Sequence, residues 1–125
     1  MSLIADYVLD AAVDAVREAT RLFVCKLEPT TYAEASSTYM LGTKTSPTMG
    51  AASDRAGGGR KTTVSAITDG VVNPGDTDEP SEWWALADHV NSRLLAVGPI
   101  TSGQILVNGN TFTLTAFDVG FPDAA

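Results

Sequence analysis

The chain has one cysteine, Cys25, and one histidine, His89, the side chains best suited to nucleophilic or acid–base catalysis near neutral pH. Cys25 lies in an apolar stretch, where a thiol acts as a small hydrophobic side chain, because a reactive thiol needs exposure and a nearby base. His89 lies in a predicted turn and has no companion His or Cys for a metal site. With no second candidate base to complete a triad, we expect a protein that is not an enzyme.

Two loops have compositions that suggest a ligand. Gly57–Gly59 accept almost any backbone angle, but Arg60 and Lys61 then lead directly into a strand, without the helix that a phosphate-binding loop needs. Residues 73–82 are acidic without the alternating oxygen ligands of a calcium loop; their carboxylates are Asp76, Asp78, Glu79 and Glu82. We therefore expect no metal and no cofactor.

Composition narrows the classes of partner. The 125 residues, 44% of them hydrophobic, are enough for one domain with a single core. The net charge is −7 and the eight Lys and Arg residues are scattered, which argues against direct contact with nucleic acid. The longest apolar stretch is too short for a bilayer, and Asp6 and Asp10 occupy positions where a signal peptide has positive charge. We expect no membrane contact.

Apolar residues recur at steps of three and four between Ser2 and Ala19, which predicts an amphipathic helix with Ser2 as its N-cap. Aspartates early in this segment suit the positive end of the helix dipole. The predicted apolar face consists of Leu3, Ile4, Tyr7, Val8, Ala11, Ala12, Ala15, Val16 and Ala19. Two interpretations stay open: the face packs on the protein's own sheet, or it docks on a neighbouring subunit.

The rest of the chain predicts short strands. Arg21–Leu27 has apolar residues on both faces, as in a central or helix-covered strand. Residues 28–59 are rich in Thr, Ser, Ala, Gly and Pro and predict a long loop excursion with a short strand at 39–44. Residues 62–69 then alternate as a half-buried strand does, and an Asp-Gly pair at 69–70 indicates a turn.

Two hairpins follow in the predicted order of elements. The first joins Trp83–Asp88 to Arg93–Gly98 through a turn that contains His89. The second joins Gln104–Val107 to Thr111–Phe117 through an Asn-Gly-Asn turn. The chain is therefore expected to be mainly β, with a helical arm over residues 1–19 and a β domain over 20–125.

Adjacent tryptophans are the clearest sign of an interface. Trp83 and Trp84 point to opposite faces of one strand, so they cannot both enter the same core, and we expect one of them at an interface. Phe117, Val119 and Phe121 form an apolar C-terminal stretch that needs cover. The candidate interaction residues are Leu3, Ile4, Tyr7, Val8, Trp83, Trp84, Phe117 and Phe121.

Short motifs in a fixed order resemble those of short virion structural proteins of tailed bacteriophages. They are GRKTTV at 59–64, AITDG at 66–70, WALAD at 84–88, RLLAVG at 93–98, NTFTL at 110–114 and FDV at 117–119. Cys25 and the segment EPTTYAEA at 28–35 resemble members from phages of proteobacteria. The similarity spans nearly the whole chain, although its motifs are strands and turns.

The resemblance implies a jelly-roll-like antiparallel β-sandwich that assembles as an oligomer, and we expect a homotrimer. It brings no catalytic residues. The expected function is that of a capsid decoration or cement protein in the virion, made in the host bacterial cytoplasm, with the major capsid protein or neck and tail proteins as partners. The alternatives are a neck or tail-appendage protein, and a carbohydrate- or receptor-binding module that uses an exposed tryptophan for stacking.

Overall fold

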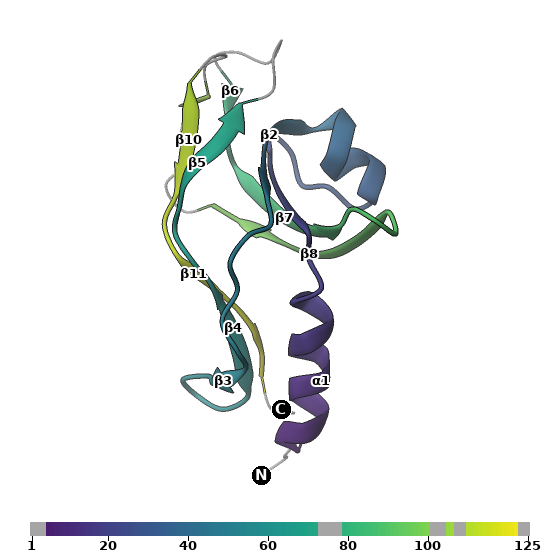
Figure 1. Cartoon of the computed structure of the whole chain (residues 1–125), viewed down its shortest axis with the longest axis vertical. Helices are drawn as coiled ribbons and strands as arrows, with labels where there is room; N and C mark the ends of the chain where they lie inside the picture. The colour runs from purple at the N-terminus through teal and green to yellow at the C-terminus, as the bar shows by residue number, and fades with distance from the viewer. Residues whose placement is uncertain (1–4, 73–78, 101–104, 107–109, 123–125) are drawn as a thin grey trace.

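The computed structural model describes residues 5–72, 79–100, 105–106 and 110–122. Over these residues the protein is mainly β, with antiparallel sheets and one N-terminal helix, as the sequence predicts (Figure 1). The helices are α1 (Asp6–Val16) and the π-helix η1 (Glu34–Thr38). The strands are β1 (Arg21–Cys25), β2 (Met40–Thr45), β3 (Ser53–Asp54), β4 (Arg60–Val64), β5 (Ile67–Val72), β6 (Glu79–Pro80), β7 (Trp83–Asp88), β8 (Arg93–Pro99), β9 (Ile105–Leu106), β10 (Thr111–Leu114) and β11 (Phe117–Phe121).

The strands form a six-stranded sheet in the order β10-β5-β2-β1-β7-β8, a three-stranded sheet in the order β11-β4-β3, and the pair β6-β9. A bent ribbon connects the two larger sheets. β4 continues into β5 and β10 into β11 across short breaks at 65–66 and 115–116, and β4 pairs with β11 while β5 pairs with β10. This ribbon runs along the left side of Figure 1. Its bend turns the two sheets toward a common core, as at the corners of packed sheets.

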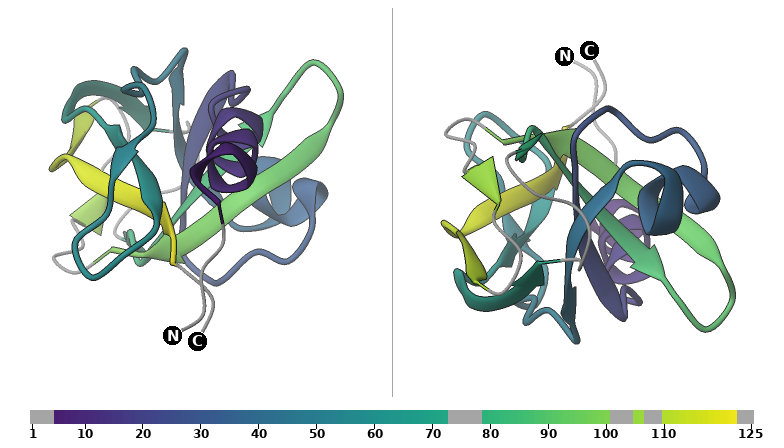
Figure 2. Two further views of the ribbon diagram at one scale, coloured as in Figure 1. Left: turned by 90° about the horizontal axis from the view of Figure 1, so that it is seen from below. Right: turned by 90° about the horizontal axis from the view of Figure 1, so that it is seen from above.

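The helix α1 covers the side that strand pairing leaves open. It contacts β4 and β11 of the smaller sheet and β8 at the edge of the larger one. Figure 2 shows it nearly along its axis, beside the strands. The main core lies between α1 and both sheets, and its buried members are Val16, Leu22, Val24, Leu41, Val64, Ile67, Val72, Trp84, Leu86, Phe112 and Val119.

A second, smaller apolar cluster lies on the other face of the six-stranded sheet, where η1 covers it. Its buried members are Phe23, Cys25, Ala35, Ala85 and Ala87. β1 is therefore buried on both faces and pairs with strands on both edges, which confirms the prediction of a central strand. The short strand predicted at 39–44 within the loop excursion is β2, which pairs with β1 and β5 in the middle of the sheet.

Two glycines in strands lie beneath aromatic rings. Gly70 is opposite Phe112 in the β5–β10 pair, and Gly98 is opposite Trp84 in the β7–β8 pair. A Cβ atom at either glycine would run into the facing ring. The prediction of a turn at 69–70 is therefore wrong, because Gly70 is a strand residue that makes room for a ring.

One predicted hairpin is confirmed and the other is wrong. β7 and β8 pair across a turn at 89–92. β9 pairs instead with β6, and β10 pairs with β5, so these two strands belong to different sheets. The Asn-Gly-Asn sequence predicts a hairpin from neighbouring residues alone. The position of β10 depends instead on a residue pair distant in sequence, because the ring of Phe112 packs over Gly70 of β5. The acidic segment considered for calcium lies mostly outside the described residues.

Candidate interaction surface

The apolar face of α1 that enters the core matches the predicted face only in part: Val16 belongs to both, whereas Leu9 and Val13 lie outside the predicted face. Leu9, Val13 and Val16, one helical step of three or four apart, are buried against the sheets. Tyr7 is 86% exposed and Val8 is 55% exposed. The helix has apolar residues on two opposite faces, so periodicity alone does not choose between them. Burial of Tyr7 would also bury its hydroxyl group, which costs free energy unless the group finds a hydrogen-bond partner. Leu9, Val13 and Val16 have no such group.

The outer face of α1 is defined here as Tyr7, Val8, Ala11 and Ala15, all of them exposed. They lie close together on the helix because they follow one another at steps of one, three and four residues. The predicted interaction residues Leu3 and Ile4 lie outside the described residues. The prediction of Ser2 as the N-cap is wrong, because α1 begins at Asp6 with Ala5 as its N-cap. One face of the helix packs on the protein's own sheets, as one interpretation predicts; docking of the exposed face on a neighbouring subunit stays a prediction.

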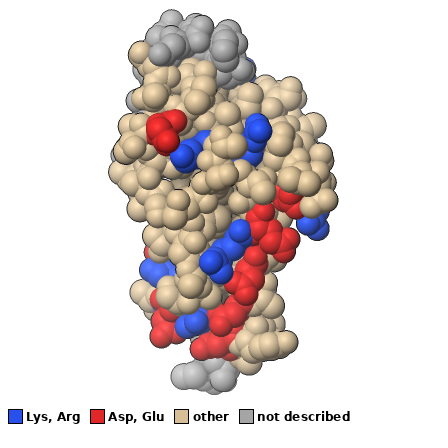
Figure 3. Space-filling view, in the orientation of Figure 1, with Lys and Arg blue, Asp and Glu red and all other residues tan. Residues whose placement is uncertain are grey.

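A row of carboxylates borders the outer face. Asp6, Asp10 and Asp14 follow at steps of four along one side of α1, and Glu18 comes two residues after its end. Figure 3 shows a nearly continuous acidic line down this side of the molecule. Asp14 pairs with Arg17 at 3.2 Å and Glu18 with Arg93 at 3.7 Å. These are surface pairs, which are screened by solvent and contribute little to stability; Asp10 of the row bonds to Arg60.

Arg60 fixes the helix against the smaller sheet. Its Nε donates to Asp10 Oδ1 at 2.7 Å, and another guanidinium nitrogen donates to Asp54 Oδ1 at 2.7 Å. A third bond, of 3.3 Å, goes to the carbonyl oxygen of Ala52. The hydrogen bonds with Asp10 and then Asp54 raise the pKa of Arg60, so its positive charge is held between two carboxylates. This anchor joins α1 to the β3–β4 hairpin and gives the outer face a defined orientation.

The tryptophans enter two different clusters. Trp84 is 9% exposed, and its ring centroid lies 4.5 Å from that of Phe117. Trp83 is half-buried against the second cluster on the opposite face of the sheet. Phe121 is half-buried against the main core. The prediction of one core tryptophan is confirmed by Trp84. Phe117, on which Trp84 packs, is itself half-buried, and an interface role for these residues stays a prediction.

The β7–β8 turn is held together by a buried carboxylate. Asp88 is 4% exposed and accepts hydrogen bonds from the side chain of Asn91 at 2.7 Å and from Arg93 at 3.0 Å. These two bonds, the Asn91 bond first, lower the pKa of Asp88 to about 2. His89 lies in this turn as predicted, and its Nδ1 shares a hydrogen bond with the Tyr32 hydroxyl. Over the described ranges, no three His, Cys, Asp or Glu side chains gather as metal ligands.

Cys25 is a buried structural residue, as the sequence predicts. Its side chain is fully buried, and the thiol lies 3.7 Å from the carbonyl oxygen of Ala35, to which it donates. Burial raises the pKa of the thiol to about 12, so it is neutral at physiological pH. A neutral thiol without solvent access is a poor nucleophile.

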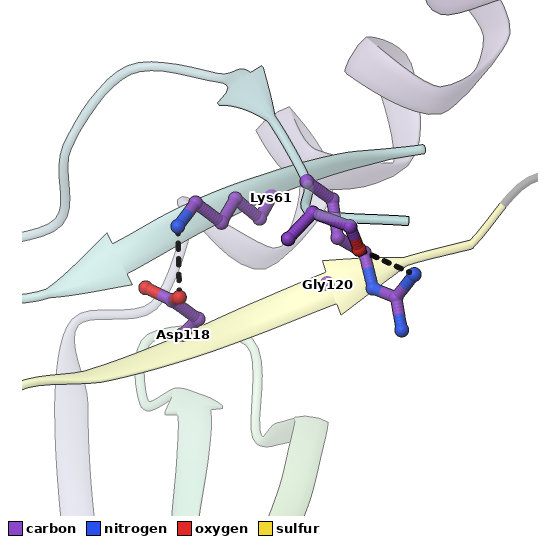
Figure 4. A pocket seen from close by; sticks show the side chains of 5 residues that line it. Lys61, Asp118 and Gly120 are labelled. Atoms are coloured by element: carbon purple, nitrogen blue, oxygen red, sulfur yellow. Dashed lines mark hydrogen bonds and ion pairs between the residues drawn. The ribbon is translucent and has the colours of Figure 1, made fainter. Parts of the chain in front are cut away.

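A small pocket opens beside the β3–β4 hairpin (Figure 4). It has a volume of about 340 Å³ and is lined by Arg55, Ala56, Lys61, Asp118 and Gly120. Lys61 pairs with Asp118 at 2.9 Å, and Arg55 donates to the carbonyl oxygen of Gly58 at 3.0 Å. The polar groups of the pocket are thus bonded to the protein itself. Gly57–Gly59, with φ of 87°, 104° and 104°, form the adjacent turn, in agreement with the predicted loop.

Neither a family model, nor a curated protein, nor a solved structure matches the chain. In the part of the chain that is described, no helix has both the length and the apolar character to cross a bilayer. The functional argument therefore rests on surfaces. Sequence reasoning missed Leu9, Val13 and Arg60: the first two belong to the second of two competing apolar faces, and no local pattern connects Arg60 to Asp10.

Proposed function

We propose that this protein is a non-enzymatic structural subunit of a bacteriophage virion, and that it decorates or cements the capsid. The observation that carries the proposal is the outer face of α1, which leaves Tyr7 86% exposed and Val8 55% exposed although the opposite face of the helix is buried. Exposed apolar patches with a polar border are typical of protein contact sites. The resemblance of the motif order to that of short virion proteins of tailed phages supports placing that contact in a particle.

The jelly-roll sandwich and the homotrimer belong to the same proposal. The support for a sandwich is that strands of the six-stranded and three-stranded sheets contribute side chains to one core. The support for an oligomer is the resemblance. A neck or tail-appendage role uses the same kind of contact and is the runner-up.

The alternatives from other classes have less support. A glycan-binding module needs an exposed tryptophan beside polar groups, whereas Trp84 is buried and Trp83 is half-buried. An enzyme needs a nucleophile with a base, whereas the Cys25 thiol is buried and neutral. A thermal-shift screen against glycans tests the first alternative directly.

Locating the protein in purified particles tests the proposed function. We expect mass spectrometry to find it in the virion and electron microscopy with a labelled antibody to place it on the head. Particles made without the gene should then release their DNA at a lower temperature than complete particles. Label on the neck or tail would support the runner-up, and absence from washed particles would refute a virion role.

A further inference from the structure

The outer face of α1 combines two properties that together define a partner. Tyr7, Val8, Ala11 and Ala15 are exposed, and four acidic residues, Asp6, Asp10, Asp14 and Glu18, lie in the same segment of the chain. Small side chains at Ala11 and Ala15, one turn apart, let another element approach the helix backbone closely, because the distance between packed elements depends on the side chains at their contact. Tyr7 and Val8 supply the larger apolar contacts at one end.

The charge of the outer face favours a different protein, rather than a second copy of this chain, as its binding partner. Two copies of α1 in contact would bring two acidic rows together, and like charges at short distance oppose association. Arginines offset part of this charge, because Asp10, Asp14 and Glu18 pair with Arg60, Arg17 and Arg93, but the chain as a whole carries a net charge of −7. Within the described part, five of its eight Lys and Arg residues already pair with its own carboxylates: Arg17, Lys44, Arg60, Lys61 and Arg93.

The anchor beneath the helix makes this surface suitable for binding. Arg60 bonds Asp10 to the smaller sheet at 2.7 Å, so the inner side of the acidic row is fixed while the carboxylates of Asp6, Asp14 and Glu18 stay at the surface. A surface that is already ordered loses less conformational entropy on binding.

We propose that the outer face of α1 binds a basic amphipathic helix of another protein, whose apolar side covers Tyr7 and Val8 and whose Lys or Arg residues lie against the acidic row. The inference rests on the proposed function, because it names the chemistry of the partner in that contact. A helix laid along an apolar face with charged borders is a recurrent mode of recognition. The proposed homotrimer then uses a different surface.

Model peptides test the chemistry of this surface on the full-length protein. The probe is a helical peptide of leucine and lysine, about 18 residues long so that it can form a helix, and its control replaces every lysine with glutamate. Isothermal titration calorimetry at low and high salt measures the affinity. We expect the lysine peptide to bind, the glutamate peptide not to bind, and the affinity of the lysine peptide to fall as salt screens the carboxylates.

Matched variants locate the binding. Tyr7→Ala/Val8→Ala removes exposed apolar groups without harming helix propensity and should weaken the lysine peptide about tenfold or more. Val90→Ala, at an 80% exposed position on the β7–β8 turn, is the control and should not change the affinity. Asp6→Asn/Asp14→Asn should weaken binding at low salt and flatten its salt dependence. Circular dichroism confirms that each variant is folded.

Three results would overturn the inference. They are equal binding of the glutamate peptide, unchanged binding by the Tyr7 and Val8 double variant, and light scattering that shows an oligomer dissociated by that double variant, which would make a second copy the occupant. The particle experiment is independent of these results. If the protein is present in virions and the double variant is incorporated normally, the outer face is not the contact and the virion role stands; if the protein is absent from virions, the virion role fails whatever the peptides do.

Discussion

Val8 and Val13 belong to the same helix but differ completely in exposure. Val13 is fully buried against the sheets, whereas Val8 is 55% exposed on the outer face. The two side chains are chemically identical, so apolar character did not decide which one the fold covers. The surface that receives the helix decided it, since β4, β8 and β11 form a gap that Leu9, Val13 and Val16 fill. The difference separates residues that maintain the fold from residues that remain available for a partner.

The largest expected effect is in the core that the inner face of α1 helps to close. Phe112 is 1% exposed and its ring covers Gly70, so Phe112→Ala should lower the free energy of unfolding by about 3–5 kcal/mol. Urea unfolding followed by tryptophan fluorescence measures the change. Val71→Ala, at a 59% exposed position on the neighbouring strand, should stay within about 0.5 kcal/mol of wild type. Similar losses in both variants would mean that the core is not closed around Phe112.

A pair of substitutions on α1 tests the comparison directly. Val13→Ala removes buried methyl groups and leaves a cavity, so it should cost about 2 kcal/mol of stability. Val8→Ala should change stability by less than about 0.5 kcal/mol, because this side chain is already largely in water. Urea midpoints of the two variants, measured under the same conditions, provide the check. A larger loss from Val8→Ala would reverse the assignment of the two faces.

The smallest expected effect is confined to acidic pH and lies away from the helix. The folded-state pKa of Asp88 is lowered to about 2, against about 3.9 for an unperturbed aspartate. The unfolded chain therefore binds the proton more readily, and the stability contributed by this carboxylate is fully present above about pH 4 and is lost as pH falls toward 2. Asp88→Asn should lower the melting temperature at neutral pH and flatten its dependence on pH between 4 and 2. Parallel curves for variant and wild type in this range would show that the turn does not depend on the charge of Asp88.

Patterns of apolar, polar and turn residues correctly predicted several individual strands and the hairpin whose two strands are close in sequence. β7 and its hairpin with β8 follow from alternation and turn residues, and the two-sided burial of β1 follows from its apolar run. The opposite orientation of Trp83 and Trp84 also follows from strand geometry, and the structure places them in separate clusters.

The failures share a cause in long-range packing. Gly70 reads as a turn residue, but its role is set by Phe112, which arrives from a distant strand. The pairing of β9 with β6 likewise has no local signal. On α1, two apolar faces competed, and only the assembled sheets selected Leu9 and Val13 for burial. The sequence pattern places Tyr7, Val8 and Val16 on one apolar face. In the structure Val16 is buried, whereas Tyr7 and Val8 are exposed on the outer face.

The contact of α1 with β11 has a consequence for how the chain folds. The helix ends at Val16 and the strand begins at Phe117, so this contact closes a loop that contains nearly all of the β structure. Contacts between distant segments slow folding, because the entropy of loop closure is lost before the contact forms. Until β11 is in place, the helix lacks part of its support and both of its apolar faces are accessible to solvent. Correct assembly therefore depends on the inner face finding its strands before either face finds a neighbouring chain.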